Sequence, residues 1–182
     1  VNRLVMDEKY DLILSIGQVV PHEVIGMANH AKNLFVGVGG SDMINSSHMV
    51  GAVYGMERMM GRDKTPVRQV FDYALEHFLS HLPLHFIQTV CTAPGGVINT
   101  HGLFISADRS CFEKAVELAQ KTNLTLVDRP MDKVVVYLNP EEFKSTWLGN
   151  KSVYRTRMAI ADGGELIVLA PAVGRFGEDD EN

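Results

Sequence analysis

The sequence predicts an α/β fold, with the end of a first α/β domain followed by the start of a second, β-α-β domain. Apolar segments of strand length alternate with amphipathic segments of helix length along the 182 residues, as is typical of α/β proteins. From about Pro130 the order is strand, helix, strand, which favours a parallel β-α-β unit. We expect a boundary close to residues 124–130, with domains at 1–124 and 125–182.

The first elements lie around a glycine-rich stretch. Aliphatic and β-branched residues in Tyr10–Val20, stopped by Pro21, predict a buried strand. Residues 21–42 show no clear period, so they predict a loop that includes a short strand at Leu34–Val38.

Two helices are expected next. The first covers roughly His48–Met60, capped by Asn45 or Ser46 and closed by Gly61. The second opens at Pro66, a residue favoured in a first helical turn. Apolar residues recur along it at helical spacing. They are Val67, Val70, Phe71, Ala74, Leu75, Phe78 and Leu79.

The remaining elements follow from local signals. Strands are expected at 84–93 and 97–107, joined by a turn in which Gly95 and Gly96 supply unusual dihedrals. An amphipathic helix runs from near Ser110 to near Asn123.

The second domain is expected to contain two strands and one helix. The strands are at 133–139 and 165–172, and the segment 141–164 is helical in its second half and ends at Gly163–Gly164.

Composition excludes several classes of protein. The net charge of −5 and pI of about 5.8 give no basic surface for nucleic acid. No apolar run approaches the ~20 residues of a membrane span, and no signal peptide is visible. The two cysteines, Cys91 and Cys111, do not form a disulfide framework, so a cytoplasmic location is expected. The acidic run at 177–182 is expected to be a solvated tail.

Three histidines and a lysine gather between residues 21 and 51. His22, His30 and His48 lie 8 and 18 residues apart, which matches no zinc motif, so spacing alone makes a zinc site unlikely. The plain alternative puts His22 at a strand end, His30 on the surface and His48 in a first helical turn. The run Gly37–Gly40 predicts a tight turn more than a phosphate site.

The stretches DLILSIGQVVPHEVIGMANHAKN and INSSHMVGA resemble the central segment of the lactate racemase family. The family pattern is a strand ending in Gly, then Pro-His, a lysine ten residues after that histidine, and a second histidine sixteen residues later. Here these positions are Gly17, Pro21, His22, Lys32 and His48. The segment YRTRMAIADGGELIVLA resembles a later helix–strand segment of the same family.

The resemblance implies a nickel-pincer nucleotide as cofactor and a small 2-hydroxy acid as substrate. Lys32 would be joined to the cofactor through a thioamide, His48 would complete nickel coordination, and His22 would be one of two catalytic acid/bases. Imidazole suits Ni(II), a desolvated lysine can form a covalent link, and histidine exchanges protons near neutral pH.

The resemblance also implies that the chain is an internal piece of a larger enzyme. Residues 1–124 would be the C-terminal portion of the cofactor-binding domain and 125–182 the beginning of a second domain. An N-terminal part would bind the cofactor phosphate and supply the second histidine. The isolated piece is expected to be inactive and to self-associate through exposed apolar surface.

Two stretches depart from the family pattern. The family has Gly-Gly-Arg before the lysine, where this chain has Asn29, His30 and Ala31. The family's carboxylate-binding Gln and Lys are replaced, so Arg155 or Arg157 is expected to hold the substrate carboxylate. By composition alone, these arginines belong to a solvated helix face. A non-catalytic metal- or nucleotide-binding module on the same scaffold remains the alternative to an isomerase.

Overall fold

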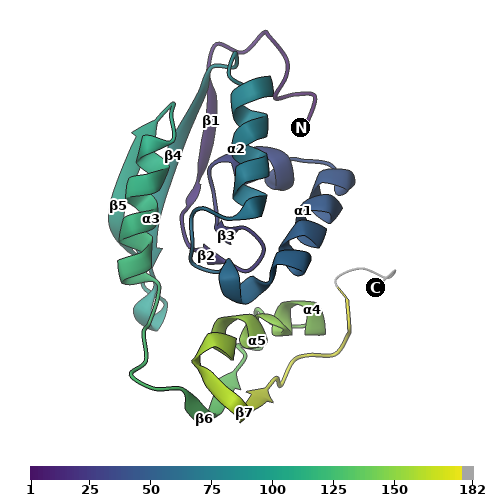
Figure 1. The fold of residues 1–182 in the computed structure, drawn as a ribbon, viewed down its shortest axis with the longest axis vertical. Helices are drawn as coiled ribbons and strands as arrows, with labels where there is room; N and C mark the ends of the chain where they lie inside the picture. The colour runs from purple at the N-terminus through teal and green to yellow at the C-terminus, as the bar shows by residue number, and fades with distance from the viewer. Residues whose placement is uncertain (178–182) are drawn as a thin grey trace. The chain divides into compact units, whose positions relative to one another are not determined.

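The computed structural model describes residues 1–177 and divides the chain into two compact units (Figure 1). The first unit is Val1–Thr125 and the second begins at Leu126, one residue beyond the expected boundary. Except for Gly177, the acidic run expected to be a solvated tail lies outside the described residues.

A mixed three-stranded sheet forms the centre of the first unit. Its strands are β1 (Ile13–Gln18), β4 (Leu84–Thr92) and β5 (Asn99–Ser106), in the order β1-β4-β5. β1 is parallel to β4, and β4 is antiparallel to β5. The hairpin turn η3 (Pro94–Gly96) contains two glycines with φ of 63° and 82°, which confirms the predicted strand–turn–strand.

The glycine-rich stretch after β1 is more ordered than the predicted loop. β2 (Pro21–His22) and β3 (Gly26–Met27) form a small antiparallel hairpin. The strand expected at Leu34–Val38 is wrong, since a π-helical turn, η1 (Asn33–Gly37), stands there. The consecutive residues Leu34 and Phe35 are both buried, and a strand would have pointed them to opposite faces.

The first long helix, α1 (Ser41–Tyr54), begins and ends earlier than predicted. Gly40 is its N-cap in an extended conformation, and Gly55 at φ 101° ends it, so neither Asn45 nor Gly61 sets its limits. A short 3-10 turn, η2 (Met56–Arg58), follows. His48 therefore lies in the middle of the helix and not in its first turn.

Helices α2 (Pro66–Phe78) and α3 (Ser110–Thr122) are close to their predicted bounds. Both lie against the same face of the sheet (Figure 1). Val67 and Phe71 of α2 are buried, but Val70 and Phe78 are exposed, so the predicted apolar stripe was too wide. The buried residues of α3 are Cys111, Phe112, Ala115, Val116 and Ala119.

The second unit contains the predicted parallel β-α-β arrangement. β6 (Met131–Tyr137) pairs in parallel with β7 (Ile160–Leu169). Between them run α4 (Thr146–Gly149), α5 (Lys151–Thr156) and η4 (Arg157–Ala159). Gly163–Gly164 does not end the helix as predicted. It lies inside β7, where the register with β6 shifts and Gly163 has a φ of 77°.

The sheet of the first unit leaves one face open. Ile16, Ile87 and Ile105 lie side by side in one row across the three strands. Ile16 is 64% exposed and Ile105 58% exposed, with Leu14 and Leu103 exposed on the same face. The helices are short by comparison with a membrane span: among residues 1–177, none is both long and apolar enough to cross a membrane.

We expect the 182-residue chain to self-associate through this open sheet face, because contiguous exposed aliphatic rows favour association in water. Sedimentation velocity at increasing concentration would show species heavier than the monomer. The double variant Ile16→Thr/Ile105→Thr should shift the chain to monomer, whereas Val53→Thr, an exposed valine on α1, should not. A monomeric unaltered chain at every concentration would contradict this expectation.

Candidate functional site

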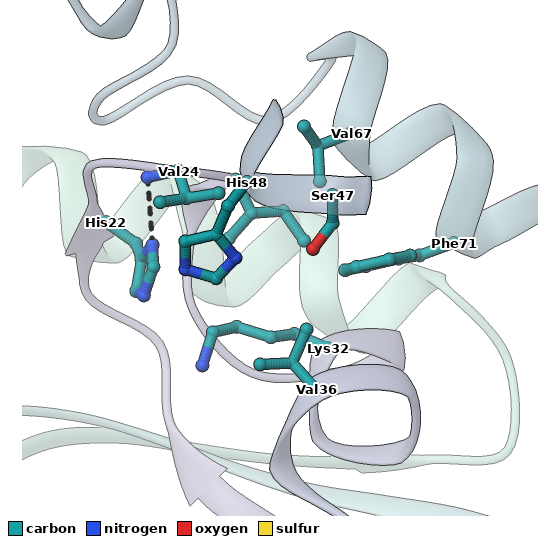
Figure 2. Close-up of a pocket in the computed structure, with 9 residues that line it drawn as sticks. His22, Val24, Lys32, Val36, Ser47, His48, Val67 and Phe71 are labelled. Atoms are coloured by element: carbon teal, nitrogen blue, oxygen red, sulfur yellow. Dashed lines mark hydrogen bonds between the residues drawn. The ribbon is translucent and has the colours of Figure 1, made fainter. Parts of the chain in front are cut away.

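Three residues singled out by the sequence line one cavity. The cavity has a volume of about 60 Å³, and His22, Lys32 and His48 all border it. They come from β2, from the residue before η1 and from α1. Figure 2 shows the polar ends of these three side chains gathered at one end of the cavity. The other lining residues are Val24, Ile25, Val36, Ser47, Val67 and Phe71.

His22 is held by the turn that follows it. Its Nδ1 accepts a hydrogen bond from the backbone N–H of Val24 at 3.1 Å (Figure 2). A carboxylate oxygen of Glu23 lies 4.0 Å from the same nitrogen. Since a backbone N–H can only donate, Nδ1 carries a lone pair and the neutral ring has its proton on Nε2.

His48 is held in the opposite manner. Its Nδ1 lies 2.6 Å from the carbonyl oxygen of Ile44, one turn earlier in α1. A carbonyl can only accept, so Nδ1 carries the proton and the neutral ring has its lone pair on Nε2. A histidine whose Nδ1–H is fixed by a carbonyl oxygen has the arrangement usual for metal ligation through Nε2.

Lys32 follows a left-handed turn. Asn29 and His30 have φ values of 77° and 58°, and Asn and His are among the residues that tolerate this region. The Asn29 side chain donates to Gly17 O at 2.6 Å and accepts from the backbone N–H of His30 at 2.7 Å. It also accepts from the Asn33 side chain at 2.6 Å. These bonds fix the backbone that presents Lys32 to the cavity.

Arg68 holds the same turn from the other side and was missed by the sequence reading. It is 1% exposed. Its guanidinium donates to Met27 O at 2.6 Å and to Asn29 O at 3.3 Å, and lies 4.4 Å from the centre of the Phe112 ring. Burial lowers the pKa of Arg68 to about 10, an effect that the negative charge of Asp72 opposes. The signal that the sequence offered was the position of Arg68 in α2, next to Val67 and among residues with the apolar spacing of a buried helix face.

His30 is not the exposed residue that the plain alternative expected. It is 1% exposed and its ring stacks on Phe86, with centroids 4.0 Å apart, and on Phe112 at 5.1 Å. Burial, followed by the positive charges of Arg68 and Arg109, lowers its pKa to about 3. The left-handed turn points this ring into the core, so His30 is structural and outside the cavity.

We expect His30 to make folding stability fall in acid. The unfolded chain takes up a proton near pH 6.5 and the folded chain only near pH 3, so stability present above pH 6.5 is lost as the pH falls between these values. The free energy of unfolding should decline by on the order of 1 kcal/mol per pH unit. Urea unfolding from pH 7 to 4 would measure this slope.

The variant His30→Asn, which tolerates the left-handed turn, should flatten that slope relative to the unaltered chain. His77→Asn removes an exposed histidine on α2 and should leave the slope unchanged. Asp72, whose pKa is raised by burial, is present in both variants, and its carboxylate lies 4.0 Å from Nδ1 of His30. Equal slopes in the unaltered chain and His30→Asn would refute this account.

The other predicted positions lie elsewhere. Arg155 is in α5 and Arg157 begins η4, both exposed and both in the second unit, whereas every residue lining the cavity belongs to the first. The Gly37–Gly40 run links the end of η1 to the N-cap of α1, and a Cβ at Gly39 would collide with the carbonyl of Phe35. Within residues 1–177, no group of three or more His, Cys, Asp or Glu side chains could hold a metal ion.

Comparison with solved structures gives a likeness that extends over the whole chain. The chain matches the crystal structure of a Thermotoga maritima protein, a target of the Northeast Structural Genomics Consortium, with a TM-score of 0.83 and 25% sequence identity. The match covers 100% of this chain and 44% of that one. No protein-family model and no curated protein matches the chain. The likeness supports the α/β fold along the whole chain.

Proposed function

We propose that this chain is part of a racemase or epimerase of a lactate-like 2-hydroxy acid that uses a nickel-pincer nucleotide tethered to Lys32. The observation that carries the proposal is the convergence of His22, Lys32 and His48 on one cavity. Their offsets along the sequence match the lactate racemase pattern, and the fold brings together the three positions to which that pattern gives roles.

The turn before Lys32 fits the attachment role. The family pattern has two glycines where this chain has Asn29 and His30, and the chain keeps positive φ at both positions. The backbone conformation that glycine would favour is thus retained by residues that tolerate it. Lys32 shares the cavity wall with the apolar side chains of Val36 and Val67, and apolar surroundings favour a reactive amine.

His48 fits the role of nickel ligand. With its Nδ1–H donated to Ile44 O, Nε2 would bind the metal. Among the described residues there is no group of three or more candidate ligands, so the remaining donors would come from the cofactor itself. When bound, the cofactor supplies an acceptor for the hydride from the substrate carbon.

The chain's own residues would then bind and move protons. His22 would accept the hydroxyl proton of the substrate and return it. Arg155 or Arg157 would hold the substrate carboxylate through paired N–H donors. Because the chain spans 44% of the length of its structural relative, the second acid/base that inversion requires would come from another part of the protein.

One observation favours a non-catalytic metal- or nucleotide-binding module instead. The Nδ1 atom of His22 accepts a hydrogen bond from Val24, and this arrangement does not permit proton transfer through Nε2. In that case Lys32 and His48 would still bind a ligand, but no substrate would be turned over.

The proposal is tested by mass and metal content. The full-length protein is produced together with the proteins that synthesise the cofactor, with a known lactate racemase as a loading control. We expect a mass adduct on the Lys32 peptide and roughly one nickel per chain. The variant Lys32→Arg keeps the charge and should carry no adduct. An unmodified Lys32 under conditions that load the control would overturn the proposal.

A further inference from the structure

The two cavity histidines are oriented by opposite hydrogen bonds. Nδ1 of His22 faces a donor, the N–H of Val24, at 3.1 Å. Nδ1 of His48 faces an acceptor, the carbonyl of Ile44, at 2.6 Å. The two neutral rings are therefore opposite tautomers, with a proton on Nε2 in His22 and on Nδ1 in His48.

Proton exchange at Nε2 of His22 requires a different arrangement from the one observed. As a base, the ring needs its lone pair on Nε2 and its proton on Nδ1. After it has accepted the substrate proton, it carries protons on both nitrogens. Nδ1–H is present in both forms, and neither form can accept a hydrogen bond from Val24.

An acceptor for that Nδ1–H lies next to the ring. The carboxylate of Glu23 is 4.0 Å from Nδ1 of His22, and the Glu23 side chain is 26% exposed, so a small movement would bring the two into contact. A carboxylate on the distal nitrogen of a histidine fixes the tautomer in which the other nitrogen is the base.

We propose that Glu23 is a positioning residue for His22: the ring exchanges its Nδ1 partner from the Val24 N–H to the Glu23 carboxylate, and only the second state transfers protons. In the exchange, Nε2 releases one proton to solvent and Nδ1 takes one up, so the ring stays neutral and nothing is oxidised or reduced. The catalytic consequence rests on the proposed racemase function, whereas the tautomer assignment does not.

The first test reads the tautomers directly. Long-range proton–nitrogen NMR spectra of the 182-residue chain at about pH 8, above the usual histidine pKa of about 6.5, should show the proton of His22 on Nε2. His48 should show its proton on Nδ1, and so should His77, whose Nδ1 lies 2.9 Å from the Tyr73 carbonyl. A His22 proton on Nδ1 in the unaltered chain would overturn the proposal.

The second test removes each partner of Nδ1. Val24→Pro lacks the N–H donor and should move most of the His22 population to the Nδ1–H tautomer. Adding Glu23→Ala should reverse that shift, because the acceptor is then gone. If the double variant keeps the Nδ1–H tautomer, Glu23 is not the partner. If Val24→Pro does not fold, the spectra of the unaltered chain and the kinetics of Glu23→Ala still test the role of Glu23.

The third test uses the loaded full-length enzyme. Glu23→Ala should lower kcat at least about tenfold with KM changed less than about threefold, because proton transfer is impaired and substrate binding is not. Glu23→Asp should recover part of the loss. Glu76→Ala removes an exposed carboxylate on α2 and should leave both constants unchanged. An effect on KM alone, or no effect, would refute the role of Glu23.

The outcomes separate this proposal from the function on which it rests. The expected tautomers with an unmodified Lys32 would remove the racemase function and leave the tautomer assignment standing. A Lys32 adduct with full activity in Glu23→Ala would leave the function standing and remove the positioning role.

Discussion

Replacing His48 with alanine is expected to abolish nickel binding while leaving the adduct on Lys32 in place. The cofactor would be attached through Lys32, which precedes η1 and also borders the cavity. His48 would supply the one nitrogen ligand that this chain gives to the metal. Nickel content should fall from roughly one per chain to background, since imidazole is the ligand that Ni(II) would lose. Elemental analysis and intact mass, measured on the same sample, report the two quantities separately.

His77→Ala is the matched control for this prediction. His77 is also an exposed helical histidine whose Nδ1 lies close to a carbonyl one turn earlier, at 2.9 Å from Tyr73 O. It does not border the cavity, so its loss should change neither nickel nor adduct. Nickel retained at the unaltered level in His48→Ala would show that the assigned role is wrong.

Replacing Arg68 with methionine is expected to cost about 3–5 kcal/mol of folding free energy, because removing one member of a buried charged network leaves its partners uncompensated. The carbonyls of Met27 and Asn29 lose their donor, and Asp72 loses a neighbouring positive charge. Urea unfolding would measure the loss. A loss of this size is a large share of the stability of a typical domain, and the yield of the Lys32 adduct should fall with it.

Arg58→Met provides a control with similar contacts on the surface. Arg58 donates to one carbonyl, Tyr54 O, at 2.8 Å, and its guanidinium lies 4.4 Å from the Tyr54 ring centre, but its side chain is exposed. Its replacement should cost less than about 1 kcal/mol. If the two variants lose equal stability, the buried position of Arg68 does not have the importance assigned to it.

The sequence predicted best the elements that depend on neighbours along the chain. The β4–β5 hairpin follows from two strand segments around Gly95 and Gly96, and α3 follows from its own apolar spacing. The start of α1 was misplaced because its N-cap is Gly40, a residue that marks turns more often than helix starts, while Asn45 offered a stronger but incorrect capping signal.

Offsets along the chain predicted some residues of the candidate site and missed others. His22, Lys32 and His48 line one cavity, and offsets along the chain were enough to single out these three positions. Arg68 could not be found in this way, because its partners are carbonyl groups that lie 39 and 41 residues earlier in the chain. The burial of His30 depends on the backbone angles of one turn, which residue types alone do not fix.

The residues that line the cavity come from one continuous stretch of chain. β1 ends at Gln18, β4 begins at Leu84, and the two strands are direct neighbours in the sheet. All nine lining residues fall between these strands, from His22 to Phe71. The two ends of this stretch are therefore held next to each other by the pairing of β1 with β4. A homologous segment could be exchanged for the stretch without changing the pairing of β1 with β4, and a new ligand preference could arise by recombination at two points.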